Sequence, residues 1–126
     1  MEKTFSLTPQ QEAVVTNRGG NLLVAAAAGS GKTKVLVDRI MERICHEHQN
    51  ITDFLVITYT KAAATELRAK ITTELSKRLA ANPSDKHLQN QLHLVYGAQI
   101  STVHSFCANL LRSYSAMAKL APDFRV

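Results

Sequence analysis

The sequence has few of the features of a secreted, disulfide-stabilised or membrane-spanning protein. Its 126 residues include two cysteines, Cys45 and Cys107, which stand far apart and without the spacing of metal ligands. We therefore expect two reduced thiols in or near a core. Residues 1–5 lack the long apolar stretch of a signal peptide, and no window approaches the length of a membrane span. These absences predict a cytoplasmic protein without membrane contact.

The remaining composition is that of an ordinary globular domain. Apolar residues make up 45% of the chain and charged residues 20%, and the length suits one modest domain. The net charge of +5 mildly favours polyanionic partners, although charge alone is weak support for nucleic-acid binding.

Segments with strand and helix patterns alternate along the chain. Short apolar runs predict buried strands at residues 21–24, 54–58 and 99–102. This alternation predicts an α/β fold with a parallel sheet covered on both faces. Capping signals and helical spacing predict one helix that begins at Pro9 and another that begins at Lys32. Further helices are expected at 62–79, from the break at 82–85 as far as Val95, and at 104–118.

The most informative segment runs from Ala26 to Thr33 and ends in Gly31-Lys32-Thr33. It follows an apolar run and precedes a helical pattern, and this context favours a phosphate-binding loop over an ordinary glycine-rich turn. Glycines let backbone N–H groups approach phosphate oxygens, and the next helix offers its N-terminus to an anion. Lys32 is suited to reach the β- and γ-phosphates, and the Thr33 hydroxyl to ligate Mg²⁺. Ala26 stands where the usual pattern has glycine. We interpret the segment as a nucleotide site.

Hydroxyl-rich segments follow the other two expected strands. They are Thr58-Tyr59-Thr60-Lys61 and Ser101-Thr102-Val103-His104-Ser105-Phe106. Because ligands bind beyond the carboxyl ends of parallel strands, we expect both segments and the phosphate loop to line one edge. Hydroxyls hold phosphates and aromatic rings stack bases, so the mixture suits a single-stranded nucleic acid. Taken alone, Thr58, Tyr59 and Thr60 fit a strand end that runs into a helix cap as well as they fit a binding site. His104 taken alone fits a helix-capping or core histidine better.

Four motifs in this order resemble those of the UvrD/Rep-like superfamily-1 DNA helicases. They are Leu7-Thr8-x-x-Gln11, the loop 26–33, Thr58-Tyr59-Thr60 with Ala62 to Arg68, and Ser101 to Phe106. The phosphate loop and the last motif most resemble the branch formed by the A subunits of the AddAB-type ATP-dependent helicase–nucleases. The RecB-type branch is the nearest alternative.

The resemblance implies a fold and a set of site residues. The fold is a P-loop NTPase of the RecA-like type, with residues 1–126 forming part of motor domain 1A. Gln11 would read the adenine edge, which an amide can do by pairing with N6 and N7. Lys32 would be the catalytic residue, and Thr33 would hold Mg²⁺. The residues implied in ATP binding are Gln11, Ala26, Ala27, Ala28, Gly29, Ser30, Gly31, Lys32, Thr33 and Lys34. Those implied in DNA binding are Thr58, Tyr59, Thr60, Lys61, Thr102, His104, Ser105 and Phe106.

Hydrolysis also needs a carboxylate pair at a strand end and an arginine finger. None of the ten aspartates and glutamates follows an apolar strand as an Asp-Glu pair. We therefore expect an N-terminal fragment, truncated before that motif, which binds ATP and Mg²⁺ but hydrolyses ATP poorly alone. By resemblance, the full protein would be a bacterial, nucleoid-associated helicase for double-strand break repair and recombination. Its partners would be DNA and a second helicase–nuclease subunit.

Two other functions compete with the helicase hypothesis. One is a complete nucleotide- or DNA-binding module that does not hydrolyse ATP. The other is a P-loop kinase or another small NTPase, in which Tyr59, Thr60 and His104 are merely structural. Glu66 and Arg68 are expected to be exposed helix charges or a structural pair rather than catalytic groups. Asp38, Arg39, Glu42 and Arg43 are expected mainly on the solvated side of their helix.

Overall fold

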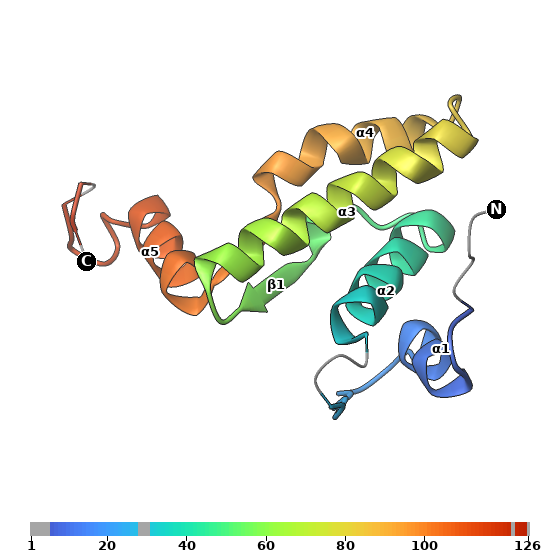
Figure 1. Ribbon diagram of the computed structural model, residues 1–126. Coiled ribbons are helices and arrows are strands. Elements are labelled where there is room, and N and C mark those ends of the chain that lie inside the picture. The colour runs from blue at the N-terminus through green and yellow to red at the C-terminus, as the bar shows by residue number, and fades with distance from the viewer. Residues whose placement is uncertain (1–5, 28–30, 122, 126) are drawn as a thin grey trace.

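Helices and two parallel strands alternate in the computed structural model, which describes residues 6–27, 31–121 and 123–125 (Figure 1). The prediction of an α/β fold with a parallel sheet is confirmed. The elements are α1 (Pro9–Thr16), α2 (Lys32–His46), β1 (Leu55–Thr58), α3 (Lys61–Ala81), α4 (Lys86–Leu94), β2 (Gln99–Thr102) and α5 (Val103–Ser113), with 3-10 turns at Ile51–Asp53 and Val95–Gly97.

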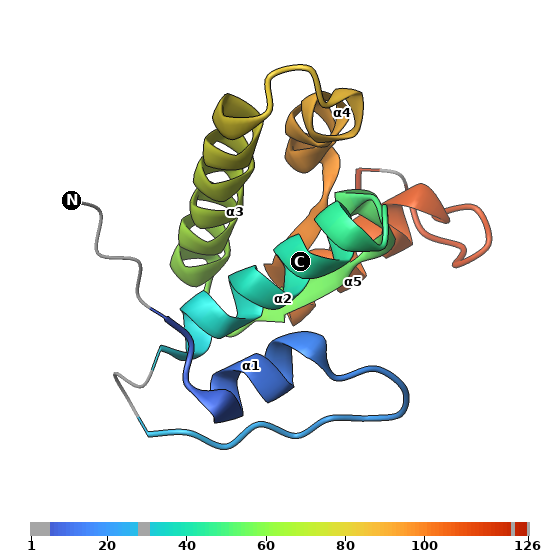
Figure 2. The same ribbon diagram turned by 90° about the vertical axis from the view of Figure 1, so that its right-hand side faces the viewer.

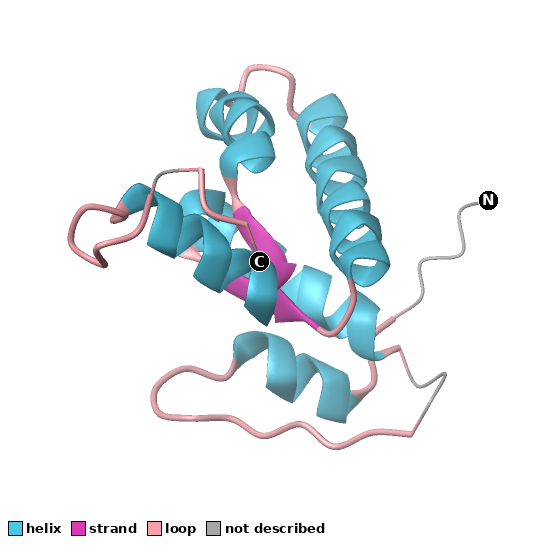
Figure 3. Cartoon of the chain, turned by 90° about the vertical axis from the view of Figure 1, so that its left-hand side faces the viewer, coloured by secondary structure: helices cyan, strands magenta, loops and turns pink. Residues whose placement is uncertain are grey.

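The two strands pair in parallel with their carboxyl ends level. Figure 3 shows the two strands lying side by side. The register joins Leu55 to Gln99 at one end and Thr58 to Thr102 at the other. Val56 and Ile100 are buried in the core, whereas Leu55 and Ile57 are 52% and 42% exposed. Among the residues that the structure describes, the sheet is therefore covered on one face, and the prediction of two covered faces is wrong. The reason is that α3 packs on the strands, while α5 has no buried residue of its own.

The predicted strand at residues 21–24 does not form. This segment has no regular structure and runs as a loop alongside α1 (Figure 2). Its side chains are exposed, with Leu23 at 93%. A strand needs a neighbour to accept and donate its backbone hydrogen bonds. Within the described part of the chain, β1 and β2 pair only with each other, so the apolar run alone is insufficient.

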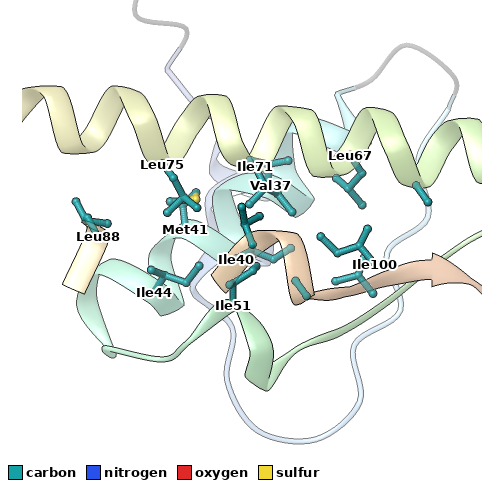
Figure 4. Close-up of a cluster of buried hydrophobic side chains, with 14 residues drawn as sticks. Val37, Ile40, Met41, Ile44, Ile51, Leu67, Ile71, Leu75, Leu88 and Ile100 are labelled. Carbon is teal, nitrogen blue, oxygen red and sulfur yellow. The ribbon is translucent and has the colours of Figure 1, made fainter. Parts of the chain in front are cut away.

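The core lies between α2, α3 and the sheet (Figure 4). On α3, the buried residues Leu67, Ile71 and Leu75 are four positions apart and form one face of the helix. Each such side chain contributes about 1.5–3 kcal/mol when fully buried. The α2 helix supplies the opposing side chains Val37, Ile40, Met41 and Ile44, and the chain after it supplies Ile51.

The two cysteines differ in their surroundings. Cys45 packs against the core, as expected, whereas Cys107 on α5 is exposed, contrary to the expectation. Both lie within the described residues, and neither forms a disulfide. The α5 helix ends at Ser113, so the prediction of a helix to residue 118 is wrong for its last turn. The Ser113 hydroxyl bonds to the Asn109 carbonyl, a contact that tends to bend or weaken a helix end.

Arg68 on α3 ties the helix layer to the sheet. Its Nη1 donates to the carbonyls of Val95 (2.6 Å) and Tyr96 (3.3 Å), and its Nη2 donates to those of Ala98 and Ile100, both at 3.1 Å. The expectation of an exposed charge or of a pair with Glu66 is therefore wrong for Arg68. Glu66 instead pairs with Lys70 at 2.8 Å, and this hydrogen bond and the lysine charge lower the pKa of the Glu66 carboxyl.

Gln91 on α4 is a polar residue buried beside the core. Gln91 is fully buried; its Oε1 accepts from the Ile51 N–H at 2.7 Å, and its Nε2 donates to Asn50 Oδ1 at 2.8 Å. Both bonds satisfy polar groups that would otherwise be buried without a partner.

Across the described ranges, no helix combines the length and apolar character needed to cross a membrane.

Replacing Arg68 by Met should loosen β2. The change removes the charged donor from four carbonyls, and hydrogen bonds to a charged group each contribute about 1.5–3 kcal/mol. We expect the free energy of local unfolding to fall by about 2 kcal/mol or more. The rate of amide hydrogen exchange over residues 95–102 should then rise roughly thirtyfold. Hydrogen exchange with mass spectrometry measures this. Lys70→Met, which removes an exposed cation two positions away, is the control and should leave exchange there unchanged.

Candidate nucleotide site and strand-end edge

The α1 helix begins at a capping box that fixes the Gln11 side chain. Thr8 Oγ1 accepts from the Gln11 N–H at 3.2 Å, and Gln11 Oε1 accepts from the Thr8 N–H at 2.9 Å. Pro9 occupies the first helical position, where its missing N–H has no consequence. The predicted helix start is confirmed, and the reciprocal bonds hold the carboxamide at the N-terminal end of α1.

Gly31 connects this carboxamide to the helix that follows the phosphate loop. It is the N-cap residue of α2 and has φ +84°, a left-handed conformation that favours glycine. A β-carbon at this position would lie 3.4 Å from Gln11 Nε2. Gly31 has no side chain with which to cap the helix, whereas side chains of Thr8, Thr60, Asp85 and Thr102 cap α1, α3, α4 and α5.

A pocket of about 770 Å³ opens between α1, the chain that follows it and the start of α2. It brings together Gln11, Ala26 and Lys32, three of the residues implied in ATP binding. Figure 2 shows α1 and α2 side by side, with the connecting chain passing beneath them. The other described lining residues are Thr8, Gln10, Val14, Gly20, Asn21, Leu22, Val24, Ala25, Val35, Leu36 and Arg39. None of these described residues is an aspartate or a glutamate.

The remaining residues of the loop prediction fall into three groups. Ala28, Gly29 and Ser30 lie outside the described residues. Ala27 and Thr33 are exposed at the two sides of that gap. Lys34 points away from the pocket, because it follows Lys32 by two positions, or about 200° around a helix. Its Nζ lies 2.6 Å from Asp38 Oδ2, and both residues line a groove between α2 and α3. The structure therefore gives Lys34 no contact with the candidate nucleotide pocket.

Two arginines hold the C-terminal end of α1. Arg39 Nη1 donates to the carbonyls of Val14 (2.6 Å) and Asn17 (2.8 Å). Arg18 Nη1 donates to those of Val15 and Asn17, and its Nε pairs with Glu47 beyond α2. The expectation that Arg39 is a solvated charge is wrong. The missed signal is that α1 has no basic residue in its last turn, so cations for its terminal carbonyls must come from elsewhere.

The Arg39 guanidinium has a crowded, positive environment. Burial and then the neighbouring charges of Arg43 and Arg18 lower its pKa below the ordinary value, and Glu47 acts in the opposite direction. An arginine stays protonated under these conditions because its pKa is so high. Arg39 is thus a permanent cation beside the negative end of the α1 dipole.

The second site is the edge at which both strands end. The parallel register sets Thr58 beside Thr102, and α3 and α5 begin within three residues of these positions. Lys34 of α2 and Glu66 of α3 line one groove between these helices. The expectation of a shared edge is confirmed for the two segments that follow β1 and β2. The phosphate loop follows no strand in the described part of the chain, so its place at that edge stays a prediction.

Several hydroxyls at this edge cap the protein's own helices. Thr60 Oγ1 accepts from the Ala63 N–H at 3.1 Å, and Thr102 Oγ1 accepts from the Ser105 N–H at 3.2 Å. Thr102 also donates to Ser105 Oγ, and Thr58 Oγ1 donates to the Thr60 carbonyl. The capping role that the sequence left open is therefore present at Thr60 and Thr102.

Other side chains at the edge face solvent. Tyr59 is 99% exposed, and Lys61 and His104 are exposed as well. Ser105 and Phe106 are partly buried. An exposed aromatic ring, a cation and an imidazole beside two helix N-termini form a surface that can contact both bases and phosphates.

Comparison with known proteins identifies the family. Residues 7–126 match the model of the UvrD/REP helicase N-terminal domain. The chain belongs to the UvrD/REP helicase N-terminal domain family. This confirms the resemblance inferred from the four motifs.

Individual members of the UvrD/REP family carry a more specific name. The A subunit of the ATP-dependent helicase/nuclease of Lachnoclostridium phytofermentans is 48% identical over 100% of this chain. The proteins of that name from Clostridioides difficile and Oceanobacillus iheyensis are 47% and 46% identical over 94% of it. The aligned part covers 9% of the first relative and 10% of the other two, so the chain spans about a tenth of their length.

Replacing Gly31 by Ala should disturb the junction between Gln11 and α2. A left-handed conformation costs a residue with a β-carbon about 1–2 kcal/mol, and the new methyl group would contact the Gln11 amide. We expect amide exchange in the first turn of α2 to rise by roughly five- to thirtyfold. Gly97→Ala is the matched control, because a β-carbon there meets nothing within 4 Å; it should change stability by less than about 0.5 kcal/mol. Equal effects of both variants would contradict the strained role of Gly31.

Proposed function

We propose that this chain is the ATP-binding part of an ATP-dependent DNA helicase of the type found in helicase/nuclease A subunits. The observation that carries the proposal is the single pocket shared by Gln11, Ala26 and Lys32. A carboxamide suited to an adenine edge and a lysine suited to phosphates line one cavity, beside an uncapped glycine at a helix start. The names of the relatives support the same activity.

In the proposed complex, the adenine lies against Gln11 and the phosphates lie at the start of α2. The capping bond with Thr8 holds the Gln11 carboxamide in place, and such an amide offers both an acceptor and a donor to an adenine edge. Gly31 lets phosphate oxygens approach the first N–H groups of α2, and Lys32 neutralises the β- and γ-phosphates. The Thr33 hydroxyl would hold Mg²⁺, and this ion would neutralise part of the phosphate charge.

We assign DNA binding to the strand-end edge, with Tyr59, Lys61 and His104 as its exposed contacts. The supporting observations are the exposure of these side chains and the two helix N-termini beside them. Tyr59 can stack on a base, and Lys61 and the helix N-termini can contact phosphates. Thr60 and Thr102 contribute by fixing those N-termini, because their hydroxyls cap the helices. Ser105 and Phe106 remain assigned to the same edge.

In this proposal, the catalytic carboxylates and the arginine finger belong to the rest of the intact protein. The chain would supply nucleotide binding and part of the DNA track, and closure of a second motor domain would drive stepping along single-stranded DNA. The relatives are named as one subunit of a helicase/nuclease, which supports a different, second subunit in the assembly. We further propose that the assembly acts in the bacterial cytoplasm, on nucleoid DNA, in break repair and recombination.

Replacing Lys32 by Ala in the intact protein should abolish DNA-stimulated ATPase activity. The change removes the cation assigned to the β- and γ-phosphates, and we expect a loss of at least about a hundredfold. Steady-state ATP hydrolysis with and without single-stranded DNA measures it. Lys77→Ala, which removes an exposed lysine of α3, is the control and should retain activity. Unwinding that persists in Lys32→Ala would contradict the assignment.

Replacing Tyr59 by Ala should weaken single-stranded DNA binding without affecting ATP binding. One stacked base contributes about 1–3 kcal/mol, so the expected loss of affinity is roughly five- to a hundredfold. Fluorescence anisotropy with a labelled oligonucleotide measures it. Tyr96→Ala is the matched control, because Tyr96 is also highly exposed, at 79%, but lies on the turn before β2. If both variants bind DNA equally well, Tyr59 is not a contact.

A further inference from the structure

The α1 helix has little apolar anchorage of its own. It is eight residues long, and Val15 is its one buried residue. A helix of this length is marginal in isolation, so its position depends on tertiary contacts. Whatever holds α1 in place therefore also determines where the Gln11 carboxamide lies.

Among the described residues, Arg39 of α2 makes side-chain hydrogen bonds to the C-terminal end of α1. Arg39 reaches across from α2 and donates from one nitrogen to the Val14 and Asn17 carbonyls, at 2.6 and 2.8 Å. Bonds from a charged donor to a helix C-terminus are among the stronger polar contacts in proteins. Arg18 and Glu47 add an exposed bridge between the chain after α1 and the chain after α2, which contributes little alone.

The opposite end of α1 carries the Gln11 amide, packed against Gly31. The two ends are joined by a short rigid helix, about 12 Å long at 1.5 Å per residue. A change at the Arg39 end therefore tilts or shifts the Gln11 end relative to the phosphate loop. Recognition through two hydrogen bonds tolerates displacements of only about 0.5 Å.

We propose that Arg39 is a positioning residue that sets the preference of the pocket for adenine. It does so by fixing α1, and with it Gln11, relative to Gly31 and Lys32. This inference rests on the proposed nucleotide function. Arg39 also lines the candidate pocket, but the proposed role depends on its hydrogen bonds to the Val14 and Asn17 carbonyls.

The test compares three probes bound to the intact protein: ATP, GTP and inorganic tripolyphosphate. Tripolyphosphate has no base and reports on the phosphate loop alone. Arg39→Met should lower the preference for ATP over GTP by about tenfold, within the range expected for loss of one bidentate contact to a base. Its affinity for tripolyphosphate should change less than about twofold, because the phosphate loop is untouched. Arg39→Lys keeps the charge and should recover part of the preference.

Arg43→Met is the matched control, because Arg43 lies one turn further along α2 and its nearest carboxylate oxygen, on Glu47, is 4.0 Å away. It should leave all three affinities unchanged. An unchanged ATP-to-GTP ratio in Arg39→Met, or an equal loss for ATP and tripolyphosphate, overturns the positioning role. If Arg39→Met fails to fold, the same two outcomes are read from Arg39→Lys.

The unsubstituted protein distinguishes failure of this inference from failure of the proposed function. Equal affinity for ATP and GTP overturns the inference but leaves nucleotide binding intact. Absence of binding to ATP and to tripolyphosphate overturns both.

Discussion

The guanidinium of Arg68 is the contact on which the strand-end edge depends. It joins α3 to four carbonyls in the chain that leads into and along β2. These bonds hold the chain that enters β2 against α3, beside the strand pairing that sets its register against β1. The register in turn sets Thr58 beside Thr102 and aligns the starts of α3 and α5. One partly buried cation thus supports a surface that presents two helix N-termini side by side.

At that edge, structural and binding roles are divided between neighbouring residues. The hydroxyls of Thr60 and Thr102 are engaged with N–H groups of the first helical turns. Tyr59 lies between Thr58 and Thr60 and is almost fully exposed. The alternation follows from the local backbone, because a residue that caps a helix turns its side chain toward the helix and its neighbour turns away. The many hydroxyls that suggested nucleic-acid binding can therefore serve two purposes, helix capping and binding. Helix capping explains Thr60 and Thr102.

The candidate nucleotide site shows the limits of sequence reasoning most clearly. The helix start at Lys32 and the helix cap at Thr8 were both predictable, because each is a pattern within a few residues. The apolar run 21–24 matched a strand pattern equally well, yet it forms no strand among the described residues, because pairing depends on a partner elsewhere. Lys34 was assigned to the nucleotide by its position in the motif, but helical geometry directs it to Asp38.

The sequence by itself determined the local elements: the helix caps, the four-residue spacing of Leu67, Ile71 and Leu75, and the strand β2 at 99–102. Tertiary structure decided the roles of Arg39 and Arg68, which look like surface charges in the sequence. Their partners lie 22 to 32 residues away and are backbone carbonyls. Every residue carries such a carbonyl, so no pattern of side chains marks which ones an arginine will reach. Only the packing of α1 on α2, and of α3 on the sheet, selects them.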